Sequence, residues 1–280
     1  MREENSLELI SQLSTENQGR YCSKEDIKLL VLHSLDIDRN TLYRENPSVD
    51  KVQLKKIVDF IERRNLGEPL AYILGTKGFW NLDFFIDENV LVPRPETELM
   101  VEKIVEIFKY KNIFILDVGT GSGCILLSIL SELKNSSGIG LDISKQAIRV
   151  AKANSEKSKL TGRTKFLNRC IDDVYNKKFD LIVSNPPYIK RKELKNLVDD
   201  IKKFEPKLAL DGGNDGLDVI KKVIYKSRSI LKIKGMLALE IGNEQFKKVS
   251  KILRSNKFKT RYLVNDYRTN IRCILSTLEN

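Results

Sequence analysis

Hydrophobic and polar positions follow a helical period up to about residue 75. Apolar residues recur there at three- and four-residue spacing, without the alternation typical of strands. Two predicted helices are "SKEDIKLLVLHSL" (23–35) and "SVDKVQLKKIVDFIERRN" (48–65). Ser23 and Asp26 form a capping-box pattern, and Gly67 stands where helix C-termini favour glycine. The pattern therefore predicts a small N-terminal helical domain over residues 1–75.

The period then changes to two. In "GFWNLDFFIDENVLV" (78–92), aromatic and aliphatic positions alternate with polar ones, which is typical of two paired strands. We therefore expect a hairpin linker over residues 76–92. The following stretch, "PRPETELMVEKIVEIF" (93–108), is a predicted helix with acids in its first turn, where they complement the helix dipole.

Strands and helices alternate from residue 113 onward. Apolar strands are predicted at 113–119, 138–144, 179–185 and 236–242, with helices at 124–134, 145–157, 217–231 and 244–254. This alternation is typical of an α/β fold with a doubly wound parallel sheet. No helix separates the last two strands, 258–267 and 271–278, so one of them should be antiparallel. We expect this domain to extend over residues 93–280.

Composition excludes several classes of protein. The 280 residues are 41% hydrophobic and 31% charged, as in globular proteins. No apolar run approaches the roughly 20 residues of a membrane span, and the polar start is not typical of a signal peptide. We expect no membrane partner and a cytoplasmic location. Neither a disulfide framework nor a metal site is expected, because His33 is the single histidine and no CxxC is present.

Net charge leaves the function open. Lys and Arg outnumber Asp and Glu by 49 to 38, which gives +11 at pH 7. A positive protein favours acidic partners such as RNA. Lysine, however, is abundant throughout the sequence, as a biased genome would produce. Charge therefore does not distinguish a nucleic-acid partner from a protein partner.

The stretch "LDVGTGSG" (116–123) joins a predicted strand to a predicted helix. Its glycines can adopt positive φ and let the backbone approach a ligand at the carboxyl ends of the strands. Asp142 ends the next predicted strand, where an acid can accept two hydrogen bonds from a ribose. The spacing is GxGxG, and Cys124 replaces the third glycine of a dinucleotide fingerprint. The loop and Asp142 together favour a ribose-containing ligand over a simple tight turn, and the spacing disfavours an NAD-dependent oxidoreductase.

The stretch "SNPPYIK" (184–190) ends a buried predicted strand. Proline fixes its own φ and keeps the preceding residue extended, so Asn185 is presented rigidly. The stretch "NPPY" (185–188) resembles the signature of amino-methyltransferases. The resemblance implies that the Asn185 side-chain oxygen and the Pro186 carbonyl accept both hydrogens of a conjugated amine and direct its lone pair at the methyl group to be transferred. Tyr188 can pack on a planar amide or base. No general base is required before the transfer.

These two motifs resemble those of class I S-adenosylmethionine-dependent methyltransferases that methylate an adenine amine or a glutamine amide. The resemblance implies a seven-stranded, mostly parallel, Rossmann-like sheet. It also implies S-adenosyl-L-methionine as cofactor and S-adenosyl-L-homocysteine as product. The residues that it assigns to the cofactor are Gly119, Thr120, Gly121, Ser122, Gly123, Asp142, Ile171 and Asn185. Those that it assigns to substrate binding are Asn185, Pro186, Pro187 and Tyr188, of which Asn185, Pro186 and Tyr188 are assigned to catalysis.

The adenine contact is the place where the sequence departs from its relatives. Proteins with the most similar motifs carry Asp-Trp at the positions where this chain has Cys170 and Ile171. Ile171 can still pack against the adenine ring, and Asp172 is the alternative contact. Asp117 is expected either to face the methionine end of the cofactor or to cap the backbone that follows it.

Three longer blocks narrow the resemblance. "GEPLAYILGTKGFWNLDFFID" (67–87), "LVPRPETELMVE" (91–102) and "FEPKLALDGGNDGLD" (204–218) are similar to those of the release factor glutamine methyltransferase (HemK) family. The resemblance implies that the helical domain recognises the substrate. It implies that the substrate is the glutamine of the Gly-Gly-Gln loop in class 1 peptide chain release factors. We expect a monomer with no stable nucleic-acid partner.

Some assignments stay open at this point. Residues 93–96 ("PRPE") can wall the pocket or simply begin a helix, and Phe79 and Trp80 can lie near substrate or pack the hairpin. An adenine methyltransferase of nucleic acids shares the chemistry, but no separate region for flipped bases is visible. A non-catalytic, ribosome-associated protein is disfavoured by the intact glycine loop, Asp142 and Asn185.

Overall fold

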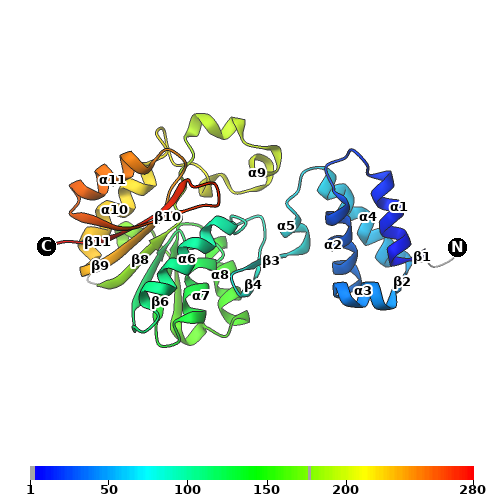
Figure 1. Ribbon diagram of the computed structural model, residues 1–280, viewed down its shortest axis with the longest axis horizontal. Helices are drawn as coiled ribbons and strands as arrows, with labels where there is room; N and C mark the ends of the chain where they lie inside the picture. Colours follow the sequence, from blue (N-terminus) through cyan, green and yellow to red (C-terminus); the bar gives the residue numbers. More distant parts are fainter. Residues whose placement is uncertain (1–3, 176–177) are drawn as a thin grey trace. The chain divides into compact units, whose positions relative to one another are not determined.

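A computed structural model describes residues 4–175 and 178–280. The chain divides into two compact units (Figure 1). The first comprises Met1–Gly75 with Val198–Phe204, and the second comprises Thr76–Leu197 with Glu205–Asn280. The predicted helical domain includes residues 1–3, which lie outside the described residues.

The first unit is helical, as its apolar spacing predicts. Its helices are α1 (Ser6–Glu16), α2 (Lys24–Leu35), α3 (Arg39–Glu45), α4 (Lys51–Asn65), α5 (Leu70–Leu74) and α9 (Asp199–Phe204). The strands β1 (Glu4–Asn5) and β2 (Ser48–Val49) form a short ladder beside them. The capping box predicted at Ser23 and Asp26 is confirmed, because each side chain bonds the other's backbone N–H. The Tyr21 hydroxyl donates to Asp200 Oδ2 at 2.8 Å, which connects α9 to this unit.

The second unit begins with a hairpin. Strands β3 (Thr76–Phe79) and β4 (Leu82–Phe85) pair antiparallel, as the alternating aromatic pattern predicts. Helix α6 (Pro95–Phe108) follows, with Pro95 in its first turn. Proline suits this position because the first-turn N–H groups have no partner within the helix. The helix therefore begins two residues later than residue 93, the start of the predicted segment.

The centre of this unit is a seven-stranded sheet in the order β10-β11-β9-β8-β5-β6-β7. Strand β11 runs antiparallel to β9 and β10, and the other neighbouring pairs are parallel. The predicted α/β class and the single antiparallel strand are thus confirmed. The strands are β5 (Phe114–Val118), β6 (Ser137–Asp142), β7 (Thr164–Asn168), β8 (Phe179–Ser184), β9 (Leu231–Glu240), β10 (Phe258–Asn265) and β11 (Ile271–Leu278).

Helices cover both faces of this sheet (Figure 1). One face carries α6, α7 (Cys124–Glu132) and α8 (Lys145–Lys157), and the other carries α10 (Asp218–Ile230) and α11 (Phe246–Ser255). Short 3-10 helices lie in the connections at Thr161–Arg163, Ile171–Asp173, Arg191–Asn196 and Lys207–Ala209. The inner strands β5 and β8 are mostly apolar because both of their faces are buried. The edge strand β10 is largely exposed and carries charged residues, which discourage pairing with another chain.

One buried side chain joins the hairpin to the rest of the unit. Asn154 of α8 accepts from Phe85 N at 2.7 Å and donates to Phe85 O at 3.0 Å. Its amide also donates to Ser122 O at 2.9 Å, in the glycine-rich loop. The side chain thereby bonds three backbone groups on two different segments. Asn154 thus couples strand β4 to the loop that follows β5.

We predict that Asn154→Ala lowers the free energy of unfolding of the second unit by about 1–3 kcal/mol, because buried polar groups lose their partners. Trp80, the single tryptophan, lies in this unit, so its fluorescence during urea unfolding follows the relevant transition. The matched control is Asn135→Ala, an exposed turn residue that should change stability by less than about 0.5 kcal/mol. Equal effects of the two substitutions would contradict the assigned role of Asn154.

Candidate functional site

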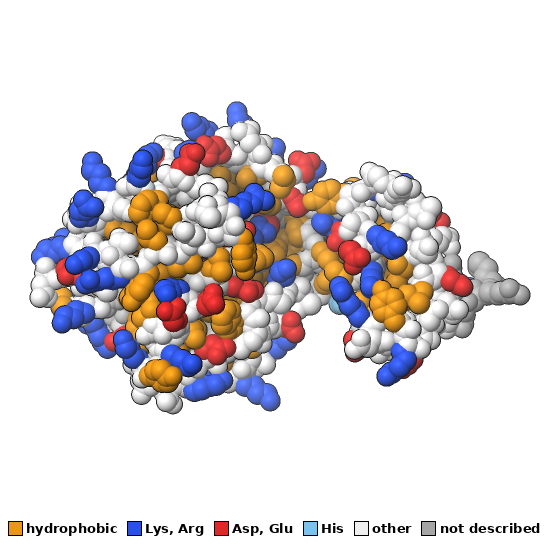
Figure 2. All heavy atoms as spheres, in the orientation of Figure 1, with side chains coloured by type: hydrophobic (Ala, Val, Ile, Leu, Met, Phe, Trp, Pro, Cys, Tyr) orange, Lys and Arg blue, Asp and Glu red, His pale blue; other side chains and the backbone are white. Residues whose placement is uncertain are grey.

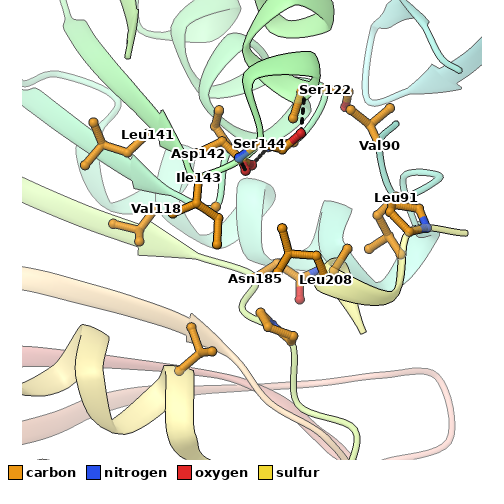
Figure 3. A pocket seen from close by; sticks show the side chains of 18 of the residues that line it. Val90, Leu91, Val118, Ser122, Leu141, Asp142, Ile143, Ser144, Asn185 and Leu208 are labelled. Carbon is orange, nitrogen blue, oxygen red and sulfur yellow. Dashed lines mark hydrogen bonds between the residues drawn. The ribbon is translucent and has the colours of Figure 1, made fainter. Parts of the chain in front are cut away.

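A cavity of about 290 Å³ lies at the carboxyl ends of the parallel strands. Strand β5 lies between β6 and β8. The chain continues from β5 through β6 to β7 on one side and then crosses to the other side, where β8 pairs with β5. Ligands of open α/β sheets bind at such a switch point. Figure 3 shows Asp142 beside Ser144, and Asn185 beside Leu208 in a separate part of the wall. The topology thus brings the two sequence motifs to one cavity.

The glycine-rich loop is fixed by backbone hydrogen bonds to the end of β6. The N–H groups of Gly119 and Thr120 both donate to Leu141 O, at 2.9 and 2.8 Å. The φ angles of Gly119, Gly121 and Gly123 are 73°, 54° and 82°, in the left-handed region that favours glycine. Four members of the predicted cofactor set in this loop line the cavity: Gly119, Thr120, Gly121 and Ser122. Gly123 instead packs beneath it, close to Leu127, Ala151 and Phe166.

The cavity wall leaves room for a ligand beside Gly119 and Gly121. A Cβ placed on Gly119 or Gly121 would meet no heavy atom within 4 Å, although both residues line the cavity. The backbone there therefore faces open space that a side chain would take from a ligand. This is the arrangement expected where a cofactor lies against the chain itself.

Asp142 lines the cavity at the end of β6. Its Oδ2 accepts from Gly121 N at 3.0 Å and its Oδ1 accepts from Ser144 N at 2.9 Å. Burial raises the pKa of this carboxyl, whereas the backbone hydrogen bonds lower it. Each oxygen of a carboxylate can accept a second hydrogen bond. Asp142 can therefore hold the loop and accept two hydroxyl groups of a ligand.

Asp117 lies beneath the loop and does not line the cavity. Its Oδ2 accepts from the Thr120 hydroxyl at 2.7 Å. Burial, together with the charge of the nearby Asp142, raises its pKa to about 7 in spite of the opposing hydrogen bond from Thr120. Of its two expected roles, the contact with the Thr120 hydroxyl favours fixing the segment that follows.

The segment after β7 contributes Cys170 and Ile171 to the cavity. Ile171 is buried and also belongs to the hydrophobic core of the sheet. Asp172 lies outside the lining and forms an ion pair with Lys222 at 2.7 Å. Of the two adenine contacts considered, only Ile171 is therefore placed at the cavity.

Asn185 follows β8 and lines the cavity together with Pro187. The preceding Ser184 is fully buried, and its hydroxyl donates to Val118 O at 2.7 Å. This bond ties the end of β8 to the end of β5, immediately before the glycine loop. The Asn185 amide nitrogen donates to Thr97 Oγ1 at 3.3 Å. Asn185 is thus held from the sheet and from α6.

The other two residues assigned to catalysis lie outside the cavity lining. Pro186 is buried, and the Tyr188 ring packs against the sheet core with the Arg272 guanidinium 5.9 Å from its centroid. Burial raises the pKa of the Tyr188 hydroxyl. The Tyr188 side chain therefore supports the loop from behind in this structure. The roles assigned to Pro186 and Tyr188 at the substrate remain predictions.

Two later segments hold the backbone of the Asn-Pro-Pro-Tyr loop. A Cβ on Gly212 would lie 2.8 Å from Pro187 O, so only glycine allows this close approach. Gln245 donates from Nε2 to Tyr188 O at 3.0 Å and to Gly216 O at 3.1 Å. The block "LDGGNDGLD" (210–218) therefore serves the loop as a rigid support.

A partly buried ion pair joins two segments of the cavity wall. Arg94 Nη2 lies 2.6 and 2.7 Å from the two carboxylate oxygens of Glu205, which is 5% exposed. Arg94 lines the cavity, as do Pro206 and Leu208 just after Glu205. Of the two interpretations of residues 93–96, both hold: the segment walls the cavity and leads into α6.

Phe79 and Trp80 pack within the hairpin region. Phe79 is 2% exposed and meets Phe84 edge to face, with ring centroids 6.1 Å apart. The Trp80 indole N–H donates to Glu132 Oε1 at 2.9 Å. Neither residue lines the cavity, so packing is the interpretation that the structure favours.

Charges on the second unit are mixed rather than segregated. Figure 2 shows Lys and Arg side chains spread over the visible face, with Asp and Glu among them. Several form ion pairs, such as Lys232 with Asp180 at 2.7 Å. Among residues 4–175 and 178–280, no group of three or more His, Cys, Asp or Glu could hold a metal ion. No helix of these same ranges is long and apolar enough to cross a bilayer.

Sequence reasoning missed the polar side chains that position the site. Asn154, Gln245 and Thr97 bond loops that are distant in sequence. In the sequence, such residues can be recognised only as polar residues at positions where the helical or strand period predicts apolar ones. The period does not indicate which backbone groups such a residue would bond.

Both family models and individual proteins of known sequence resemble this chain, and they indicate a methyltransferase. Residues 95–268 match the family described as methyltransferase small domain, and residues 12–75 match the PrmC N-terminal domain. The release factor glutamine methyltransferase of Clostridium acetobutylicum is 37% identical over 260 residues, 90% of each chain. The protein of that name from Buchnera aphidicola subsp. Schizaphis graminum is 38% identical over 264 residues, 94% of each chain.

Solved structures agree on the fold. A methyltransferase from Pyrococcus furiosus has a TM-score of 0.54 at 15% identity, covering 82% of this chain and 100% of that chain. A ribosomal protein L11 methylase from Lactobacillus delbrueckii subsp. bulgaricus has a TM-score of 0.51 at 19% identity, covering 70% of this chain and 84% of that one. These likenesses show the Rossmann-like methyltransferase fold. Because the relatives above 30% identity extend over nearly the whole chain, the family indicated by the motifs is confirmed, and this protein belongs to the release factor glutamine methyltransferase family.

Proposed function

We propose that this protein transfers a methyl group from S-adenosyl-L-methionine to the side-chain amide of the Gly-Gly-Gln glutamine in class 1 release factors. The observation that carries the proposal is the placement of Asn185 and the glycine loop on one cavity, at the ends of adjacent strands β8 and β5. The names of the relatives at 37–38% identity support the choice of substrate. S-adenosyl-L-homocysteine is the expected product.

The cofactor would lie against the glycine loop, with Asp142 accepting its ribose hydroxyl groups and Ile171 packing on its base. When bound, it supplies an electrophilic methyl group on a sulfonium. The nitrogen of a glutamine amide is a weak nucleophile because its lone pair is conjugated with the carbonyl. Asn185 Oδ1 and the Pro186 carbonyl would accept its two hydrogens, which aims the lone pair and disperses the positive charge that develops. As the nitrogen–methyl bond forms, the methyl–sulfur bond breaks, and the positively charged nitrogen, which is very acidic, then loses one proton to solvent.

The helical unit is the proposed recognition domain for the release factor. It has its own core, built from residues of α1, α2, α4 and the segments between them. A protein substrate of this kind presents the glutamine on a protruding loop, so a second contact region can select the substrate away from the reaction centre. Because release factors act in the cytoplasm, we propose the same location for this protein, acting as a monomer.

The first prediction about the proposed function concerns the methylation reaction itself. Incubating the protein and S-adenosyl-L-methionine with an intact release factor should add one methyl group, about 14 Da, to the Gly-Gly-Gln glutamine. Mass spectrometry of the intact substrate and of its peptides measures the gain and its position. A release factor with Gln→Ala in that loop is the control. Methylation of an adenine-containing oligonucleotide, with none on the release factor, would overturn the proposal.

The second prediction separates catalysis from cofactor binding. Asn185→Ala should lower kcat by about 100- to 1000-fold, because its proposed bonds strengthen in the transition state. The affinity for S-adenosyl-L-homocysteine, measured by calorimetric titration, should change far less. Asn135→Ala, at an exposed turn, is the matched control and should leave both quantities unchanged. A parallel loss of affinity and turnover would contradict the role of Asn185 at the substrate.

The third prediction about the proposed function concerns cofactor affinity, which a change at Asp142 should lower first. Asp142→Ala should weaken binding of S-adenosyl-L-homocysteine by about 10- to 100-fold, since two ribose contacts and the bond to Gly121 N are lost. Asp83→Ala, exposed on β4, is the control. Calorimetric titration at one ionic strength compares the two variants. Unchanged affinity in Asp142→Ala would count against the ribose contact.

A further inference from the structure

Glu240 is a buried acid that the proposed chemistry does not use. It ends strand β9 and is 2% exposed, in a stretch that is otherwise apolar, "MLALEIG" (236–242). A buried carboxylate is costly unless hydrogen bonds stabilise it. Its Oε2 accepts from the Thr97 hydroxyl at 2.6 Å, a short bond of the charge-assisted kind. Glu240 is therefore retained in the core by its contact with α6.

Thr97 connects this acid to the cavity. It is 2% exposed and lines the cavity wall beside Asn185. Its single hydroxyl hydrogen is donated to Glu240, so its oxygen is left only as an acceptor. The Asn185 amide nitrogen donates to that oxygen at 3.3 Å. The chain of bonds thus runs in one direction, from Asn185 through Thr97 to Glu240.

Asn185 also lowers the pKa of the Glu240 carboxyl, so it favours the ionised form. A carboxylate has no hydrogen to donate, so this contact too requires the NH₂ end of the amide. Both neighbours of Asn185 on this side are therefore acceptors. An asparagine amide can turn by 180° at little cost unless its partners distinguish the two ends.

We infer that Thr97 and Glu240 are positioning residues that fix the orientation of the Asn185 amide, with its NH₂ group toward α6 and its Oδ1 toward the cavity. The inference rests on the proposed function, in which Oδ1 accepts a hydrogen of the substrate amide. Turned around, Asn185 would present two donors to the NH₂ of a glutamine, which cannot accept them. The chain of hydrogen bonds from Asn185 through Thr97 to Glu240, called the relay below, therefore decides whether Asn185 Oδ1 can act as an acceptor beside the Pro186 carbonyl.

The protonation of Glu240 depends on its burial and on its charged neighbours. Burial, with a contribution from Glu96, raises the pKa of Glu240 to about 7, although Thr97 and Arg272 lower it. Above this pKa the carboxylate can only accept, which is the state that the relay requires. The titratable or charged groups that interact with it come from several elements: Glu96, Arg272, Tyr188, Cys124 and Cys273.

Kinetics of five variants, one of them a double variant, test this chain of hydrogen bonds at about pH 8.5, where Glu240 is ionised. Thr97→Val keeps the shape but removes the hydroxyl, and should lower kcat by about 10- to 100-fold. Thr97→Ser keeps the hydroxyl and should restore most of the rate. Glu240→Gln can donate to Thr97 and so reverse the chain, and should lower kcat similarly. In Asn185→Ala, adding Thr97→Val should cost nothing further, because the relay acts through Asn185.

A second measurement does not depend on any substrate. In protein labelled with ¹⁵N asparagine, the side-chain NH₂ signals of Asn185 are identified by their loss in Asn185→Ala. The hydrogen bonded to Thr97 should exchange slowly with solvent in the wild type and in Thr97→Ser. Exchange should be at least about tenfold faster in Thr97→Val, where the acceptor is missing. Thermal unfolding and titration with S-adenosyl-L-homocysteine confirm that each variant is folded and binds cofactor.

The outcomes separate this inference from the proposed function. Equal exchange of the Asn185 NH₂ in wild type and Thr97→Val overturns the inference, whatever the substrate. So does additive loss of kcat when Thr97→Val is combined with Asn185→Ala. Wild-type protein that fails to methylate the release factor, while the exchange pattern is as expected, refutes the function and leaves the orientation of Asn185 established.

Discussion

The site depends on the pairing of β5 with β8, the two strands whose carboxyl ends carry the motifs. Asp117 stands opposite Val183 in the parallel register, so the glycine loop and Asn185 emerge side by side. Just beyond this pair, the buried Ser184 hydroxyl donates to Val118 O at 2.7 Å. Slipping the register by one residue would exchange the faces of every side chain in β8. The strand pairing and the Ser184 bond therefore also fix the distance between the glycine loop and Asn185.

Buried polar side chains supply the next level of precision. Asn154 bonds β4 to the glycine loop, Gln245 bonds the backbone after Asn185, and Thr97 bonds Asn185 itself. Each connects segments that are distant in sequence, and each would be costly to bury without its partners. Apolar packing alone tolerates small shifts, whereas a hydrogen bond requires a particular distance and direction. These contacts thus hold loops, which have no ladder of their own, in one arrangement.

Much of the fold could be predicted from the sequence because its signals are local. The helical period before residue 75, the alternating hairpin and the alternating strands and helices all appear in the structure as expected. The boundaries of individual elements were less accurate: β9 begins at Leu231, within the segment predicted as the preceding helix. Lys232 and Lys234 break the apolar pattern there, and Leu231 is placed in the strand by its pairing with Phe179 of β8.

The sequence by itself determined the fold class, the glycine loop and the rigid presentation of Asn185, since glycine and proline act on the backbone where they stand. Only the tertiary structure decided which side chains face the cavity. It placed Asp142 and Ile171 in the wall, turned the Tyr188 ring toward the core and set Asp172 against Lys222. It also brought Glu240 and Thr97, 143 positions apart in sequence, to within 2.6 Å. Such contacts follow from how sheet and helices pack together, and no local pattern encodes the direction of a hydrogen bond between them.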